Sequence, residues 1–259
     1  MKKSLLCTLG ASLVAPLAFG QVVTILENSL NQEVLGDSPS TSYTITGATD
    51  NSVLVVGYYQ DGNDNGLDAS NFTVSGDASA FSGTLFGQRA ALGYITGVST
   101  GEAFTVSAPG PGFATGYSGF YFAVLNNVDQ SNPVNDFSIF SPDGEPTAPL
   151  PTLDVAANGF GFGVVSNNRN GQTINTAGTD VTVVSESQGN GTDHAGSYDI
   201  AILQTSGTGT LTLTGSNWSG TNERDNDELF YSFAAVPEPS SFGLIAGLVG
   251  VMALARRRR

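Results

Sequence analysis

The chain has 259 residues and is acidic, with 23 Asp and Glu residues against nine Lys and Arg residues. Residues 21–236 hold three arginines, no lysine and 22 acidic residues, which gives a formal charge of −19. Such a surface excludes nucleic-acid binding, because phosphate contacts need Lys and Arg side chains. It favours solubility and the uptake of cations.

The first 20 residues predict a secretory signal peptide, read by the Sec export machinery. Lys2 and Lys3 precede a mostly apolar run that ends at Phe19, and Ala18 and Gly20 are the small residues before a cut after Gly20. An uncleaved membrane anchor is the alternative. Cys7 is the only cysteine and leaves with the signal, so the mature protein forms no disulfide and has no thiol nucleophile or zinc–thiolate site.

The middle of the chain predicts many short β-strands. Runs rich in Val, Ile, Thr, Tyr and Phe are separated by turn signals such as Asn65-Gly66 and Asn170-Gly171. No stretch before residue 236 has the apolar period of a long amphipathic helix. The predicted strands are Val22–Glu27, Ser42–Thr46, Ser52–Tyr59, Asn71–Ser75, Leu85–Val98, Ala103–Ser107, Gly119–Asn126, Leu153–Ala156, Gly161–Ser166, Val181–Ser185, Ser197–Leu203, Gly209–Thr214 and Leu229–Ala234.

These strands predict an all-β fold with a single β-sandwich domain over residues 21–235. The Pro-rich segment Pro142–Pro151 is interpreted as a crossing loop, because neither half of the chain has enough strands to close a core alone. The order of runs such as Ser52–Gly57, Ala103–Val106 and Phe122–Asp129 resembles a jelly-roll-like module of secreted bacterial surface proteins. That resemblance covers most of residues 50–235 and implies a fold but no activity.

The most distinctive polar motif in the mature domain lies between residues 61 and 68. Oxygen-bearing side chains at alternate positions, followed by Gly66, resemble the start of an EF-hand calcium loop. Asp61, Asn63 and Asn65 would bind calcium by their side chains and Leu67 by its carbonyl group. Asp68 would replace the missing acidic residue, since the twelfth position is Phe72. A solvated turn without metal is the alternative.

Other residues are weaker candidates for a cation, catalytic or sugar-binding site. Glu223, Asp225, Asp227 and Glu228 form a second acidic run that offers a weaker cation site. His194 is the only histidine, and no G-x-S-x-G motif accompanies it, so we expect no enzyme. A hidden carboxylate pair of a carbohydrate-active enzyme remains an alternative. The aromatic residues Trp218, Tyr58, Tyr59, Tyr94 and Tyr117 are candidates for either a sugar-stacking platform or core packing.

The last 24 residues have a different character. Pro237, Glu238 and Pro239 lead into Phe242–Ala255, which contains no charge, and the chain ends on Arg256, Arg257, Arg258 and Arg259. The apolar run predicts a transmembrane helix of about 21 Å, short of the ~30 Å hydrocarbon core, so we expect a weak anchor. The arginines favour a cytoplasmic end, which places the β-domain outside the cell.

This order of three parts resembles a PEP-CTERM sorting signal over residues 236–259. The resemblance implies that an exosortase recognises Pro237, Glu238 and Pro239 and cuts nearby, after the precursor has been held in the inner membrane. It also implies delivery to the cell surface or to an exopolysaccharide or biofilm matrix. Similar tails are found on ice-binding proteins. We therefore expect an exported structural or adhesive protein, with a carbohydrate- or calcium-binding adhesin as the alternative.

Overall fold

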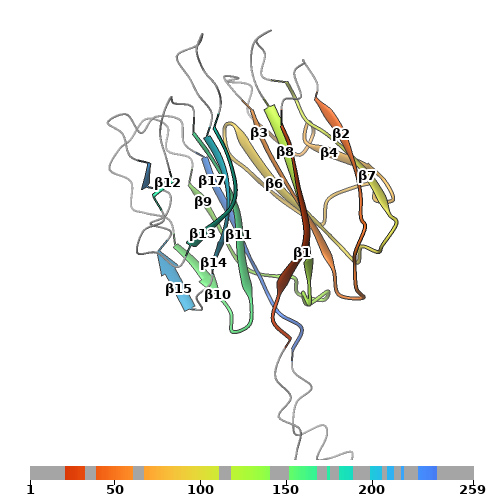
Figure 1. The fold of residues 1–259 in the computed structure, drawn as a ribbon, viewed down its shortest axis with the longest axis vertical. Coiled ribbons are helices and arrows are strands. Elements are labelled where there is room, and N and C mark those ends of the chain that lie inside the picture. Colours follow the sequence, from red (N-terminus) through yellow and green to blue (C-terminus); the bar gives the residue numbers. More distant parts are fainter. Residues whose placement is uncertain are drawn as a thin grey trace, which may run out of the picture. The chain divides into compact units, whose positions relative to one another are not determined.

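Every regular element in the described part of the chain is a β-strand, so the all-β prediction is confirmed (Figure 1). The computed structural model describes residues 21–32, 39–60, 67–110, 118–140, 152–167, 174–175, 181–188, 199–205, 209–212, 217–218 and 227–237. Gln21–Pro237 form one compact unit. None of the described residues belongs to a helix long and apolar enough to span a membrane. The predicted signal and membrane helices lie outside the described residues.

A five-stranded antiparallel sheet forms the central layer. Its strands follow the order β1-β8-β3-β6-β5. They are β1 (Thr24–Gln32), β8 (Ser118–Asn126), β3 (Val53–Gln60), β6 (Ala90–Thr96) and β5 (Gly83–Phe86). All eight residues of β3 are buried, which explains why the run Val53–Tyr59 is apolar without alternation. A strand covered on both faces needs apolar side chains on both.

A three-stranded sheet covers one face of the central layer. It consists of β2 (Ser40–Thr44), β7 (Ala103–Ser107) and β4 (Thr73–Gly76), in that order. Phe104 and Val106 of β7 pack with Leu54, Phe120 and other even-numbered residues of the central strands in one core. The remaining side chains of β7 are exposed or half-buried, so this outer strand shows the apolar–polar alternation that β3 lacks.

A second five-stranded sheet packs on the opposite face. Its order is β13 (Val181–Gln188), β14 (Asp199–Thr205), β11 (Phe160–Asn167), β17 (Asp227–Phe233) and β9 (Val134–Phe140). Val164, Leu229 and Tyr231 pack with Val55 and Tyr121 in a second core. The central sheet is thus shared by two cores, and Figure 1 shows the resulting three layers. This arrangement fits a β-sandwich with an additional layer.

Two short strand pairs complete the fold: β10 (Thr152–Val155) with β15 (Gly209–Thr212), and β12 (Ile174–Asn175) with β16 (Asn217–Trp218). Leu153 and Val155 of β10 are buried. The Asn135 side-chain amide donates to the Asp154 carbonyl at 2.8 Å, and the Asp154 N–H donates to the Asp136 carboxylate at 2.7 Å. These bonds fix β10 beside β9.

One strand prediction was wrong, and three strands, β9, β12 and β16, were not predicted. The single strand Leu85–Val98 is a hairpin, in which the Gly87 N–H donates to the Ala90 carbonyl at 2.8 Å between β5 and β6. No strand was predicted at Val134–Phe140, which forms β9. Phe137 and Ile139 are 57% and 48% exposed there, whereas Ser138 between them is buried, and β9 lies at the sheet edge. An edge strand with a polar start and exposed apolar residues lacks the pattern of a half-buried strand.

Candidate functional site at the end of the β-domain

The chain after β17 remains bonded to the fold as far as Val236. The Ala234 N–H donates to the Pro133 carbonyl and the Val236 N–H to the Asn127 carbonyl, both at 2.9 Å. Ala235 forms a β-bridge with Val128 between these bonds. Pro237 has no N–H to continue the ladder, and it is exposed. The predicted sorting motif therefore starts with the residue that follows the last of these hydrogen bonds, and Glu238 and Pro239 lie outside the described residues.

Asn127 also holds the other end of the domain. Its side-chain amide donates to the Val22 carbonyl at 3.0 Å, and the next residue, Val23, is buried in the core. Its φ of 62° lies in the left-handed region, where asparagine is tolerated better than most residues. Asn158, also at φ 62°, accepts a hydrogen bond from the Val23 N–H at 3.0 Å. Two left-handed asparagines thus hold both ends of the domain at one pole.

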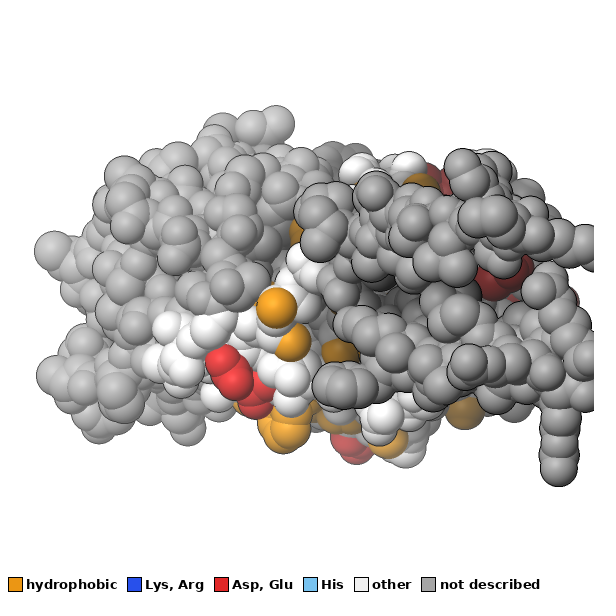
Figure 2. Space-filling view, turned by 90° about the horizontal axis from the view of Figure 1, so that it is seen from below, with side chains coloured by type: hydrophobic (Ala, Val, Ile, Leu, Met, Phe, Trp, Pro, Cys, Tyr) orange, Lys and Arg blue, Asp and Glu red, His pale blue; other side chains and the backbone are white. Residues whose placement is uncertain are grey.

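The surface of this pole carries acidic and apolar side chains. Figure 2, which views the domain from below, shows both kinds and no Lys or Arg on the coloured part of that face. Hydrogen bonds from the Ser131 hydroxyl, at 2.6 Å, and from its N–H lower the pKa of Asp129, which is therefore ionised at neutral pH. Arg89, the one basic residue among those described, lies at the opposite end, where its carbonyl accepts from the Gln60 N–H.

The predicted calcium loop is described only in part. Asp61, Asn63 and Asn65 lie outside the described residues. Leu67 has its side chain in the core, where it is 5% exposed. The Asp68 carboxylate accepts from the Ser70 N–H at 2.7 Å and the Ser70 hydroxyl at 2.5 Å, and these bonds lower its pKa. The calcium site stays a prediction, and the described residues contain no group of three or more His, Cys, Asp or Glu placed to hold a metal.

The second acidic run has a structural role at its described end. Asp227 and Glu228 are each 2% exposed in β17. The Asp227 carboxylate accepts hydrogen bonds from the backbone N–H groups of Arg89 and Ala90, the latter at 2.8 Å. Asp227 thus joins β17 to the β5–β6 turn, and the weaker cation site suggested for this acidic run stays a prediction. Glu223 and Asp225 lie outside the described residues.

The sugar-stacking platform is not assembled by the described tyrosines. Tyr58 is fully buried, and its hydroxyl donates to the Pro109 carbonyl at 2.5 Å, while Tyr59 is 5% exposed. Half-buried Tyr94 packs edge-on against Tyr231, with ring centroids 5.1 Å apart. These rings are core residues, which was the alternative interpretation. Tyr117 and His194 lie outside the described residues, and Trp218 belongs to the short strand β16.

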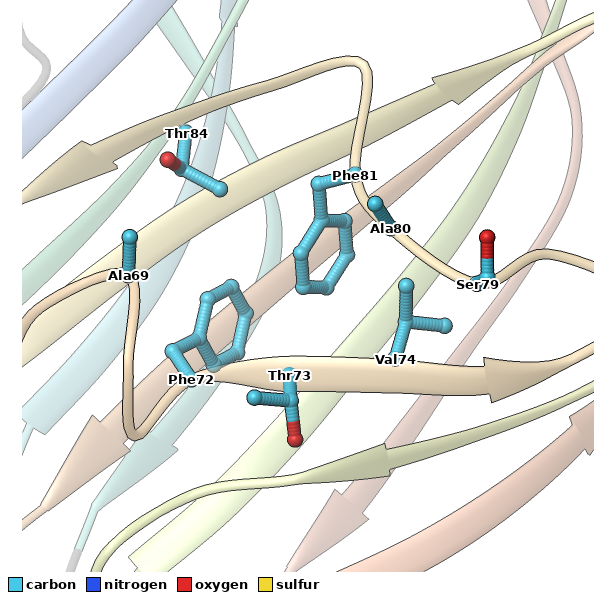
Figure 3. A pocket seen from close by; sticks show the side chains of 8 residues that line it. All are labelled: Ala69, Phe72, Thr73, Val74, Ser79, Ala80, Phe81 and Thr84. Atoms are coloured by element: carbon cyan, nitrogen blue, oxygen red, sulfur yellow. The ribbon is translucent and has the colours of Figure 1, made fainter.

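A shallow pocket of about 180 Å³ lies beside β4 (Figure 3). The rings of Phe72 and Phe81 stack in it with centroids 4.7 Å apart. The lining residues are Ala69, Phe72, Thr73, Val74, Ser79, Ala80, Phe81 and Thr84. None of these side chains is an acid or base of ordinary catalytic pKa, and the volume is below the ~300–1,000 Å³ of typical ligand pockets. The residues that line this pocket therefore supply no general acid or base.

Comparisons with known proteins give one informative match, and it lies in the tail. No curated protein matches the chain. A solved structure titled Red Clover Necrotic Mosaic Virus aligns over 85% of this chain and 98% of its own, with 12% identity and a TM-score of 0.23, too low to bear on the fold. Residues 235–259 match the PEP-CTERM protein-sorting motif. This motif implies an exported protein that an exosortase processes at the membrane from an anchored precursor.

Proposed function

We propose that this protein is a non-enzymatic structural or adhesive component of the cell surface or of an extracellular polysaccharide matrix. After export through the Sec machinery and removal of residues 1–20, the tail would anchor the precursor, and exosortase would then release or transfer the β-domain. The observation that carries the proposal is the match of residues 235–259 to the sorting motif. The match begins at the last β-bridge of the fold, and Pro237 is exposed.

The properties of the domain support a role outside the cell. Two apolar cores give stability without a disulfide, and a charge of −19 over residues 21–236 favours solubility. The resemblance of residues 50–235 to jelly-roll-like modules of secreted surface proteins agrees with this role. The described residues show only structural uses for the acidic groups Asp227 and Asp68.

The test is mass spectrometry of the carboxyl terminus of the native protein, in cells with and without the exosortase. We expect a mature end close to Pro237 only where the enzyme is present, and the intact tail in its absence. A Glu238→Gln variant serves as the matched control, because it alters the motif and leaves the β-domain intact. Full-length protein in the cytosol of exosortase-positive cells would refute the sorting route.

A further inference from the structure

Both ends of the β-domain leave it at the pole that carries Asn127. The Val22 carbonyl and the Val236 N–H bond to this one residue, by its side chain and its carbonyl respectively. In Figure 1 the red amino-terminal end and the blue carboxyl-terminal end emerge together at the lower edge of the sheets. A membrane anchor attached to either end would therefore pull on the same pole.

The connection between this pole and the predicted membrane helix is short. Pro237–Ser241 are the five residues between Val236 and Phe242. Fully extended, they span at most ~17 Å. The nine residues of β8, which run from the opposite end of the domain to Asn126, rise by about 30 Å. This tether, Pro237–Ser241, is thus shorter than β8, so the end of the domain opposite Asn127 cannot be the end nearest to the membrane.

We propose that, in the anchored precursor, the pole formed by Asn127, Asp129–Pro133 and Asn158 faces the lipid surface, where it meets the membrane-bound processing enzyme. The opposite ends of the sheets, where β3 stops at Gln60 and the β5–β6 turn carries Gln88, then face outward. This inference rests on the proposed sorting function and adds the orientation of the domain during processing.

The hydrogen bonds of the pole set the length of the tether. If Ala234–Val236 were free, three more residues would add about 10 Å. Their bonds to Pro133, Val128 and Asn127 hold them on the fold instead. The coloured part of this face shows no Lys or Arg that would attract anionic lipids (Figure 2). The orientation is therefore attributed to the short chain.

Single cysteines test the orientation, because the mature protein has none of its own. Asn132→Cys places a thiol at an exposed position on the Asn127 pole, and Gln88→Cys places one at an exposed position on the opposite end. Each full-length variant is expressed in cells that lack exosortase and is labelled in spheroplasts with a maleimide carrying a 5-kDa polyethylene glycol. We expect labelling of Asn132→Cys to be at least tenfold slower than labelling of Gln88→Cys.

A spacer variant separates membrane proximity from poor thiol reactivity. Insertion of twenty Gly and Ser residues between Val236 and Pro237 should bring both cysteines to equal labelling rates, because a flexible linker of that length spans about 25 Å. Equal rates without the spacer, in a precursor that sediments with membranes, would overturn the orientation and leave the sorting function standing. A precursor that does not sediment with membranes would overturn both.

Discussion

Replacement of Gly57 by alanine tests how closely the central sheet and the second five-stranded sheet pack. A Cβ atom at Gly57 would lie 2.4 Å from Cγ2 of Val164 in β11, and the backbone φ of Gly57 is outside the left-handed region. The cost is therefore steric overpacking, which amounts to about 1–3 kcal/mol in well-packed cores. Val164→Ala alone should cost about 2 kcal/mol, since it removes two buried methyl groups and leaves a cavity.

The double variant makes the prediction specific. Once Cγ2 of Val164 is gone, the nearest atoms to the new Cβ are the Cβ atoms of Tyr121 and residue 164, both at 3.7 Å, an ordinary contact distance. The added methyl group then fills part of the cavity. We expect Gly57→Ala to destabilise the wild-type domain and to be neutral or stabilising in the Val164→Ala background, a coupling of about 1–3 kcal/mol.

Urea unfolding of residues 21–237, followed by circular dichroism, measures each free energy of unfolding at constant slope. Gly47→Ala is the matched control, because no atom lies within 4 Å of the Cβ that it would add. Its effect should stay within about 0.5 kcal/mol. If Gly57→Ala costs the same in both backgrounds, the two sheets do not approach each other as described, and the reasoning is refuted.

Three further predictions concern single groups. Asp227→Ala should lower the free energy of unfolding by about 3 kcal/mol, because the backbone N–H groups of Arg89 and Ala90, the latter in a buried bond, lose their acceptor. Asp227→Asn keeps an oxygen and should cost less in the same urea assay. Burial raises the pKa of Tyr121 and of other core tyrosines, so the folded state keeps these protons where the unfolded chain loses them. The free energy of unfolding should therefore be unaffected by tyrosine ionisation below about pH 10 and should fall above it. Above that pH, the melting temperature of Tyr121→Phe should fall less steeply with pH than that of the wild type. Calcium at millimolar concentration should raise the melting temperature and Asp61→Ala should abolish the rise; an unchanged wild-type melting temperature would end the metal hypothesis.

The strands that local sequence predicts well are those with a strong and bounded pattern. Ala103–Ser107 coincides with β7, where alternate side chains are buried. The continuous apolar run of β3 also predicts a strand buried on both faces, but it does not show which other strands cover those faces. Because layer order depends on pairing between distant segments, the third layer could not be deduced from these runs.

The missed features depend on contacts that are remote in sequence. The β5–β6 turn contains Gly87 as its single local turn signal, and it is held by Asp227, 138 residues from Arg89. The left-handed Asn127 gives a weak local signal, because Asn-Asn pairs occur in many turns, and its link to Val22 spans 105 residues. Such features become visible only when the sheets assemble.

The sorting motif, in contrast to these features, depends on contiguous residues. A processing enzyme that recognises an extended segment needs contiguous residues free of backbone pairing, and proline supplies this by removing the N–H group. Among the described residues, the last backbone hydrogen bond of the β-domain comes from the Val236 N–H, one residue before Pro237. The motif is therefore recognisable from local sequence alone, whereas the position of the Asn127 pole, where the chain leaves the domain, depends on long-range pairing. Any ligand site of the β-domain would instead combine residues from separate strands, and its chemistry would depend on the same long-range pairing that buries Asp227.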